Sequence, residues 1–348
     1  MIDVARKLAF LLIGHAGLSA LAKPLVGSVG AILMLHRVTA LLERPESPNR
    51  HLSITPQFLD ALIGEMKRMG YAFVSMDEAV ARLRMANGGR FAALTADDAY
   101  RDNLTEALPV LEKHAAPIAI YVAPGLTGGE VDLWWEVLYD IVSAGKPIAV
   151  TMPDGKLKLD CSTPEGRAAA FRRLSDHIAG ELREEEQRAV LRGWADMVGV
   201  DASAPNRTLL MNWNEIRRCA AHPLVTIGAH SVHHYNLKRL RKESALREMY
   251  RSRDMIEAEL GRSPVHFAYP YGYAAAVGLR ETDLAREAGF VSAVTTRHGV
   301  LRPEHADSLH ALPRLSVNGR HQELAVMRAM LSGATTLAAN RGRRLVTV

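Results

Sequence analysis

Short apolar runs alternate with segments of helical periodicity from residue 31 to about residue 320. The runs are four to six residues long, which favours buried strands over buried helices. Strands are predicted at Ala31–Leu35, Tyr71–Val74, Phe91–Thr95, Ile118–Val122, Val225–Ala229, His266–Tyr269 and Phe290–Thr295.

The segments between these runs carry helix signals. At Thr55-Pro56 a hydroxyl residue suited to capping is followed by proline, which is favoured in a first helical turn. Ser75 and Glu78 have the spacing of a capping box. Helices are therefore predicted after both positions. Further helices are predicted at Glu243–Leu260 and Leu279–Ala288.

Repeated strand–helix units require parallel strands, because each crossover returns the chain to the same edge of the sheet. The sheet is then either a closed barrel or an open, doubly wound sheet. No Gly-x-Gly-x-x-Gly follows the first strand, so a dinucleotide-binding sheet lacks support. In both architectures the functional side chains gather at the carboxyl ends of the strands.

Residues 127–210 interrupt this alternation and predict a helical insertion, a cap beside the site. It divides the barrel into residues 29–126 and 211–320. Trp134-Trp135 in it either stack on a sugar or fill its core, and Glu184–Glu186 suit a solvated helix face. Residues 321–348 are predicted to form a C-terminal helix and a basic tail.

Residues 1–28 are predicted to be an N-terminal helix or a signal-like segment. Residues 8–22 are apolar and too short for a transmembrane span. A retained helix is favoured because Asp3 and His15 do not suit a signal peptide. The protein is then cytoplasmic or membrane-associated. If residues 1–22 are instead a cleaved signal peptide, it is periplasmic or secreted.

Composition narrows the class of protein. Of 348 residues, 48% are hydrophobic and 23% charged, which excludes a disordered or fibrous chain. The formal net charge of +5, with only 6% aromatic residues, does not indicate a nucleic-acid-binding protein. Two distant cysteines exclude a cysteine-built zinc site. The basic C-terminus, with Arg341, Arg343 and Arg344, is either a solvated tail or a weak anchor to an anionic membrane surface.

Chemistry-bearing residues follow three of the predicted strands. Asp97-Asp98 follow the strand that ends at Thr95, and His230 and His234 follow the strand that ends at Ala229. Pro270-Tyr271-Gly272 follow the strand that ends at Tyr269. Two imidazoles and a carboxylate suit a catalytic zinc or similar divalent cation, which leaves the second carboxylate as a base. Each piece alone has a simpler interpretation: the aspartates suit a helix N-cap, and the histidines suit a solvated surface. Their joint occurrence favours the metal site.

The sequence resembles the polysaccharide deacetylase family. The segment that begins Thr95-Ala96-Asp97-Asp98 and ends Arg101-Asp102-Asn103 is similar to the family's Thr-Phe-Asp-Asp-Gly-Tyr-x-Asp-Asn signature. The His230-Ser-x-x-His234 segment matches its second motif, and Phe267–Gly272 resembles its third. The segment Leu33–Val38 is similar to the opening strand of one branch. The resemblance covers about residues 30–320.

The resemblance implies an α/β fold, a distorted TIM-like barrel of about seven βα units with a helical insertion. It implies that Asp98, His230 and His234 hold the divalent metal, zinc being favoured, and that Asp97 is the general base. The main-chain N–H of Tyr271, which follows Pro270, would help to stabilise the oxyanion. His36 is a candidate for the general acid, or a hydrogen-bonded histidine at the barrel rim. Arg314 would supply a guanidinium to Asp97, or lies on the surface near a strand end.

Three alanines depart from the family pattern. Ala96 replaces a large aromatic residue, and Ala268 replaces the arginine that orients the base in many members. Ala99 replaces glycine, so a positive φ there would cost on the order of 1 kcal/mol.

The function implied is removal of an N-acetyl group from an N-acetylated glycan or glycan precursor, by attack of metal-bound water on the amide carbonyl. One rival is hydrolysis of another C–N bond, in a cyclic ureide or a formyl amide. The other rival, prompted by the three alanines, is an inactive carbohydrate-binding homologue.

Overall fold

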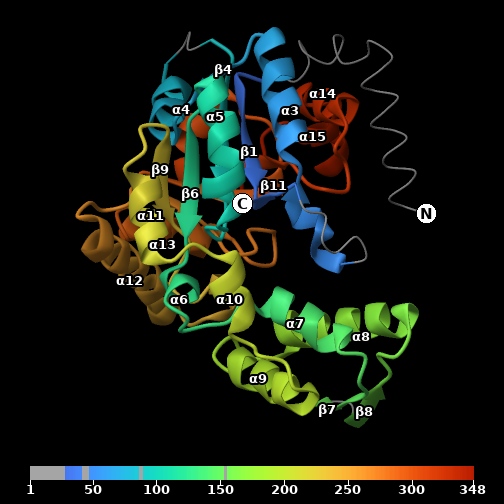
Figure 1. The fold of residues 1–348 in the computed structure, drawn as a ribbon. Coiled ribbons are helices and arrows are strands. Elements are labelled where there is room, and N and C mark those ends of the chain that lie inside the picture. The colour runs from blue at the N-terminus through green and yellow to red at the C-terminus, as the bar shows by residue number, and fades with distance from the viewer. Residues whose placement is uncertain (1–27, 41–46, 86–88, 153–154) are drawn as a thin grey trace.

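In the computed structural model, which describes residues 28–40, 47–85, 89–152 and 155–348, seven parallel strands close into a barrel (Figure 1). Their order around the barrel is β1, β12, β11, β10, β9, β6 and β5, and β5 pairs with β1 to close it. The closed barrel with surrounding helices confirms the predicted fold class. Its strands are β1 (Gly30–Leu35), β5 (Phe91–Ala96), β6 (Ile118–Val122), β9 (Val225–Ala229), β10 (His266–Ala268), β11 (Ser292–His298) and β12 (Leu312–Ser316).

The barrel is distorted at β5. Phe91–Ala93, the first half of this strand, pairs with β1 and with β4 (Ala72–Val74). Leu94–Ala96, the second half, pairs with β1 and with β6. One edge of β5 therefore pairs with the short strand β4 along its first half and with β6 along its second half. A separate two-stranded parallel sheet, β2 (Arg37–Val38) with β3 (Ser53–Ile54), follows β1.

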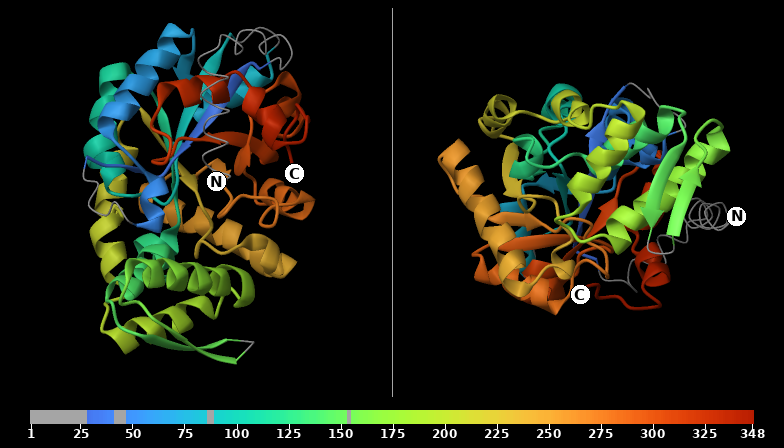
Figure 2. Two further views of the ribbon diagram at one scale, coloured as in Figure 1. Left: turned by 90° about the vertical axis from the view of Figure 1, so that its right-hand side faces the viewer. Right: turned by 90° about the horizontal axis from the view of Figure 1, so that it is seen from below.

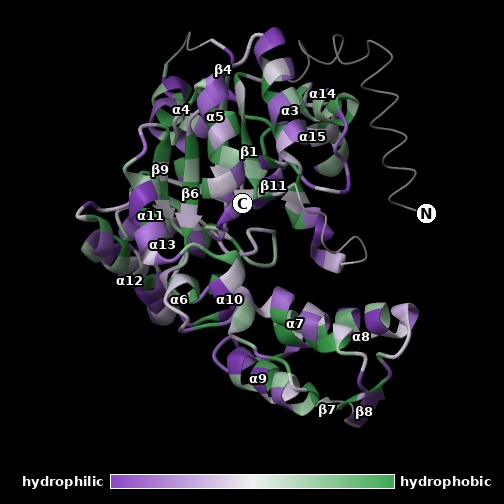
Figure 3. Cartoon of the chain, viewed as in Figure 1, coloured by the Kyte–Doolittle hydropathy of each residue, from purple (hydrophilic) through white to green (hydrophobic). Residues whose placement is uncertain are grey.

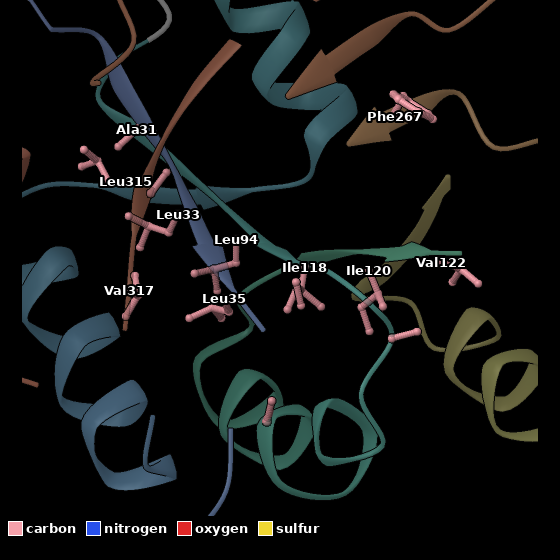
Figure 4. Packing of buried hydrophobic residues seen from close by; sticks show 14 of the residues in the cluster. Ala31, Leu33, Leu35, Leu94, Ile118, Ile120, Val122, Phe267, Leu315 and Val317 are labelled. Carbon is pink, nitrogen blue, oxygen red and sulfur yellow. The ribbon is translucent and has the colours of Figure 1, made fainter. Parts of the chain in front are cut away.

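Both faces of the barrel strands are buried, which explains why the sequence shows continuous apolar runs rather than alternation. Leu33 and Leu35 of β1 belong to the cluster that packs against the surrounding helices (Figure 4). Ile32, the residue before Leu33, belongs to a second cluster with Tyr121. The Tyr121 ring fills the space beside Gly228, where a Cβ atom would lie 2.5 Å from it.

Helices cover the barrel and contain both hydrophilic and hydrophobic residues, whereas the barrel strands are mainly hydrophobic (Figure 3). The predicted caps are present: the Thr55 hydroxyl accepts from the Phe58 N–H, and Ser75 accepts from Glu78. These helices are α3 (Pro56–Arg68), α4 (Met76–Leu83), α5 (Leu108–His114), α6 (Pro124–Thr127), α11 (Trp213–Ala220), α12 (Lys242–Leu260), α13 (Leu279–Glu287), α14 (Leu324–Leu331) and α15 (Ala334–Ala339). Single turns are η1 (Pro48–Leu52), η2 (Asn103–Ala107), η4 (Leu237–Arg239), η5 (Pro303–Asp307) and η6 (Leu309–Ala311).

The segment predicted as a helical insertion forms a lobe beside the carboxyl ends of the strands (Figures 1 and 2). It is not entirely helical, because β7 (Ile148–Met152) and β8 (Gly155–Leu159) form an antiparallel hairpin. The lobe has its own apolar cluster, which includes Leu138, Leu174 and Trp194. Its helices are α7 (Trp134–Ser143), α8 (Pro164–Asp176), η3 (His177–Glu181), α9 (Gln187–Val198) and α10 (Ala204–Leu209).

Glu184 joins this lobe to the barrel, which corrects the prediction that it lies on a solvated face. Its side chain is only 2% exposed. One carboxylate oxygen accepts a hydrogen bond from the Asn236 N–H at 2.9 Å, and the other lies 3.1 Å from the Arg239 guanidinium. Burial raises the pKa of Glu184 to about 7, although these two partners oppose the shift.

This raised pKa predicts a pH-dependent stability. Between pH 4.5 and about 7 the folded chain keeps the Glu184 proton that the unfolded chain releases, so the free energy of unfolding falls as pH rises. Relative to Glu184→Gln, the wild type should lose roughly 2–3 kcal/mol over this interval, measured by urea unfolding. Glu185→Gln, at an exposed neighbour, is the control and should titrate like the wild type. Parallel pH profiles of wild type and Glu184→Gln would contradict the prediction.

The C-terminal segment holds two helices, α14 and α15, where one was predicted. Beyond them the chain docks on the barrel: Val346 is buried, and its carbonyl lies 3.1 Å from the His305 ring. His305 is fully buried. The predicted N-terminal helix or signal-like segment lies outside the described residues. Within the described ranges, no helix has the length and apolar character needed to span a membrane.

Candidate metal centre and active site

Asp97 and Asp98 lie where β5 ends inside the mouth of the barrel. The Asp97 N–H still bonds to the Leu35 carbonyl of β1, and the backbone then turns left-handed, with φ of 69° at Asp98 and 53° at Ala99. This turn points the two neighbouring carboxylates in different directions. Neither aspartate caps a helix, so the N-cap interpretation is wrong. The cost expected for alanine at a glycine-type position, on the order of 1 kcal/mol, applies to Ala99.

His230 and His234 lie on the loop that follows β9. The loop contains two more left-handed residues, Ser231 and His234, both with φ of 55°. The His230 ring donates from Nδ1 to the Ala268 carbonyl at 2.7 Å. This hydrogen bond fixes the tautomer, so Nε2 is left as the ligand atom.

The two imidazoles and one carboxylate converge. Asp98 Oδ1 lies 3.6 Å from His230 Nε2 and 3.5 Å from His234 Nε2. Ligand bonds of about 2.0–2.1 Å at tetrahedral angles place ligand atoms roughly 3.3–3.5 Å apart, so the spacing fits a small divalent cation. Asp98 Oδ1 is buried and has no hydrogen-bond partner among the described residues, which is unfavourable unless a cation compensates it.

Burial sets the protonation of these ligands. Burial raises the pKa of Asp98, and the neighbouring Asp97 charge adds to this effect. Burial lowers the pKa of His230, and it lowers the pKa of His234 further with help from His230. Neutral imidazoles are the form that binds a metal. The site is therefore arranged to hold a cation rather than three charged side chains.

Asp97 is paired with Arg314, as the sequence suggested. The guanidinium donates from Nη1 to Asp97 Oδ1 and from Nη2 to Oδ2, both at 2.7 Å. It also donates to the Thr95 hydroxyl and the Thr295 carbonyl, and it is 1% exposed, so the surface interpretation is wrong. Burial alone would raise the pKa of Asp97, but Arg314 outweighs burial and holds this pKa well below its usual range. Asp97 therefore stays ionised and fixed in orientation.

Glu248 of α12 holds the loop that carries the histidines. Its Oε2 accepts from the N–H groups of Val232 and His233 at 3.1 and 2.9 Å, and its Oε1 lies 2.6 Å from His233 Nδ1. Glu248 is 8% exposed, so few waters compete for these bonds. Sequence analysis missed this residue, because nothing in the helix marks one glutamate as the partner of a loop.

Glu248→Gln should weaken metal binding. The amide keeps the side-chain shape but cannot accept on both sides, so the loop loses part of its support. We expect the Zn²⁺ dissociation constant to rise by about 10–100-fold, measured by titration after chelation. Glu257→Gln, at an exposed position on the same helix, is the control. An unchanged Zn²⁺ affinity in Glu248→Gln would show that the loop keeps its conformation without this carboxylate.

Tyr271 follows β10 and has a left-handed backbone, with φ of 63°. No described residue accepts from its main-chain N–H, so this donor is available to a ligand. Its ring lies 5.2 Å from the His234 ring, and its hydroxyl accepts from Trp134 Nε1 at 3.2 Å. Pro270 precedes it, and the Pro270 carbonyl accepts from the Gly272 N–H, which tightens the turn.

A cavity of about 280 Å³ lies over the Asp98, His230 and His234 cluster. His36, Asp97 and Tyr271 line it with the three ligands, whereas Pro270 and Arg314 do not. Burial lowers the pKa of His36 to about 4. The Asn103 side chain donates to the His36 carbonyl, and Asp102 accepts from Arg37 and from the Val38 N–H, so the end of the aspartate motif fixes the segment that carries His36.

Sequence analysis did not assign other residues of this cavity. His51 belongs to η1, and no motif in its surroundings marks it. Trp134 and Trp135 come from the insertion: the Trp135 ring is mostly buried and lies 5.1 Å from the His234 ring. The burial of Trp135 agrees with the interpretation that the pair fills a core, and stacking on a sugar stays a prediction. The remaining lining residues are Asn49, Leu52, Phe171, Ser175 and Thr296.

Comparisons with known proteins agree with this site. The family model described as polysaccharide deacetylase matches residues 189–291, which include His230, His234 and Tyr271. Over these residues the chain is similar to polysaccharide deacetylases, in agreement with the predicted family. No curated protein sequence matched it.

Three solved structures share the fold. The deacetylase PplD of Streptococcus pyogenes, solved with acetate, has a TM-score of 0.57 at 18% identity, over 86% of this chain and 97% of its own. IcaB of Ammonifex degensii has a TM-score of 0.54 at 18% identity, over 87% and 98%. A de-N-acetylase of Aggregatibacter actinomycetemcomitans has a TM-score of 0.52 at 14% identity, over 87% and 99%.

Proposed function

We propose that this protein removes acetyl groups from an N-acetylated glycan, with Asp98, His230 and His234 as the ligands of a zinc ion. One observation carries the proposal: Asp98 Oδ1 lies within 3.6 Å of two imidazole nitrogens, and a second carboxylate is next to it in the chain. Two imidazoles and a carboxylate suit zinc and leave coordination positions open. Bound there, the cation would supply Lewis acidity, which lowers the pKa of water to near 7 and polarises the acetyl carbonyl.

Asp97 is the base in this proposal. Its carboxylate is held by Arg314 through one lone pair on each oxygen, so other lone pairs still accept the proton of the attacking water. The guanidinium keeps the carboxylate ionised before the reaction and stops it from turning toward Asp98. Arg314 is thus a positioning residue for Asp97.

Tyr271 and His36 complete the proposed reaction. The Tyr271 N–H donates to the carbonyl oxygen as negative charge develops there. His36 donates a proton to the leaving amine. Because burial lowers its pKa to about 4, His36 is neutral near pH 7 and first has to receive the proton taken from the attacking water.

Acetate release from N-acetylated chito-oligomers tests this function. The purified protein should release acetate, lose this activity when treated with a chelator, and regain it with Zn²⁺. Release of formate or of a ring-opened acid from other substrates, with no acetate, would favour another C–N hydrolase. Sugar binding with no product would identify an inactive carbohydrate-binding homologue.

A further inference from the structure

The cavity over the metal centre continues into a larger groove. Phe171 of α8 lines both the cavity and a groove of about 860 Å³ on the insertion. The groove lies between α7 and α8, and Pro48 of the barrel borders it. Sequence motifs give no role to this surface, because it belongs to the insertion.

Both helices run from the cavity along the groove. On α8, Ser175 and Phe171 line the cavity, and Ala168 and Pro164 continue the same face along the groove. At 1.5 Å per residue this face is roughly 16 Å long. On α7, Trp134 lines the cavity, and Tyr139 and Ser143 follow along the groove.

The side chains along this path suit sugar rings. The Trp134, Phe171 and Tyr139 rings offer apolar faces, with hydroxyl and guanidinium groups between them, a combination that suits amphipathic rings. The Ser175 hydroxyl is buried and has no hydrogen-bond partner among the described residues. A sugar hydroxyl in the cavity would supply one.

We propose that this groove binds the sugar units next to the one whose acetyl group is removed. The proposal rests on the proposed function and specifies its substrate: an oligosaccharide or polymer.

Chain-length dependence tests the groove. The kcat/KM for acetate release from N-acetylglucosamine oligomers should rise at least about tenfold from the dimer to the hexamer, since remote binding energy aids the reaction only if remote sugars are bound. Ala168→Trp, which fills the groove from an exposed position of α8, should remove this rise and leave the dimer rate near wild type. Ala169→Trp is the matched control, because Ala169 is equally an exposed alanine and does not line the groove.

A second measurement separates failure of the groove from failure of the proposed function. The dissociation constants of the dimer and hexamer are measured on chelator-treated wild type, Ala168→Trp and Ala169→Trp. Tighter hexamer binding that only Ala168→Trp removes would support the groove even if no acetate is released, and would then place the failure in the proposed function. Equal affinity for dimer and hexamer, or an unchanged length dependence in Ala168→Trp, overturns the groove. So does faster turnover of a nucleotide-linked N-acetyl sugar than of the hexamer.

Discussion

Asp97→Asn is expected to lower kcat by about 10²–10⁴-fold and to leave Zn²⁺ affinity nearly unchanged. The amide retains the shape of the carboxylate but cannot accept the proton of the attacking water. The metal ligands Asp98, His230 and His234 are untouched. The measurement is acetate release at saturating substrate, together with zinc titration of the same preparation.

Stability is the necessary control for Asp97→Asn. The substitution leaves the buried Arg314 charge without its carboxylate, and breaking a buried pair costs on the order of 3–5 kcal/mol. Assays therefore belong below the melting temperature of the variant, with a folded circular-dichroism spectrum. A folded, zinc-loaded variant with near-wild-type kcat would remove Asp97 from the mechanism.

His230→Ala is expected to lose both zinc and activity. Its Nε2 is one of three ligand atoms. Loss of a residue that only supports a ligand typically weakens metal binding by about 10–100-fold, so loss of the ligand itself should weaken zinc binding by more than that. Zinc content after dialysis and acetate release report the two effects.

His222→Ala is the matched control for this variant, because its imidazole pairs with Glu112 near the surface, away from the cluster. It should keep wild-type zinc content. Full zinc content and activity in His230→Ala would show that the three side chains do not form the metal site.

The barrel and its centre could be predicted because they depend on local signals. The apolar runs marked β1, β5, β6 and β9 to within a residue, and Asp97, Asp98, His230 and His234 stand within five residues of the ends of predicted strands. Strand β12 was missed, since Leu312-Pro313-Arg314 interrupts its apolar pattern with a buried cation. Arg314 was still predicted to be the partner of Asp97. In many members of the family an arginine orients the base, and this chain has Ala268 at that arginine's position, so another arginine was expected beside Asp97.

The residues that sequence analysis missed act through distant contacts. Glu184 stands in a charged stretch that predicts a solvated helix, yet it is buried because the insertion folds back on Asn236. In the sequence, Glu248 looks like any exposed glutamate of a helix. It accepts hydrogen bonds only because the loop that carries the histidines lies next to α12. The spacing of residues along the sequence therefore predicts neither contact.

The pairing of Asp97 with Arg314 also has a consequence for biosynthesis. The two residues are 217 positions apart, and the arginine belongs to the last strand of the barrel. A nascent chain released before residue 314 would keep the aspartate pair without its counter-charge and would lack the strand between β1 and β11. We therefore expect the catalytic centre to form only after nearly the whole polypeptide has left the ribosome, so that incomplete chains remain inactive.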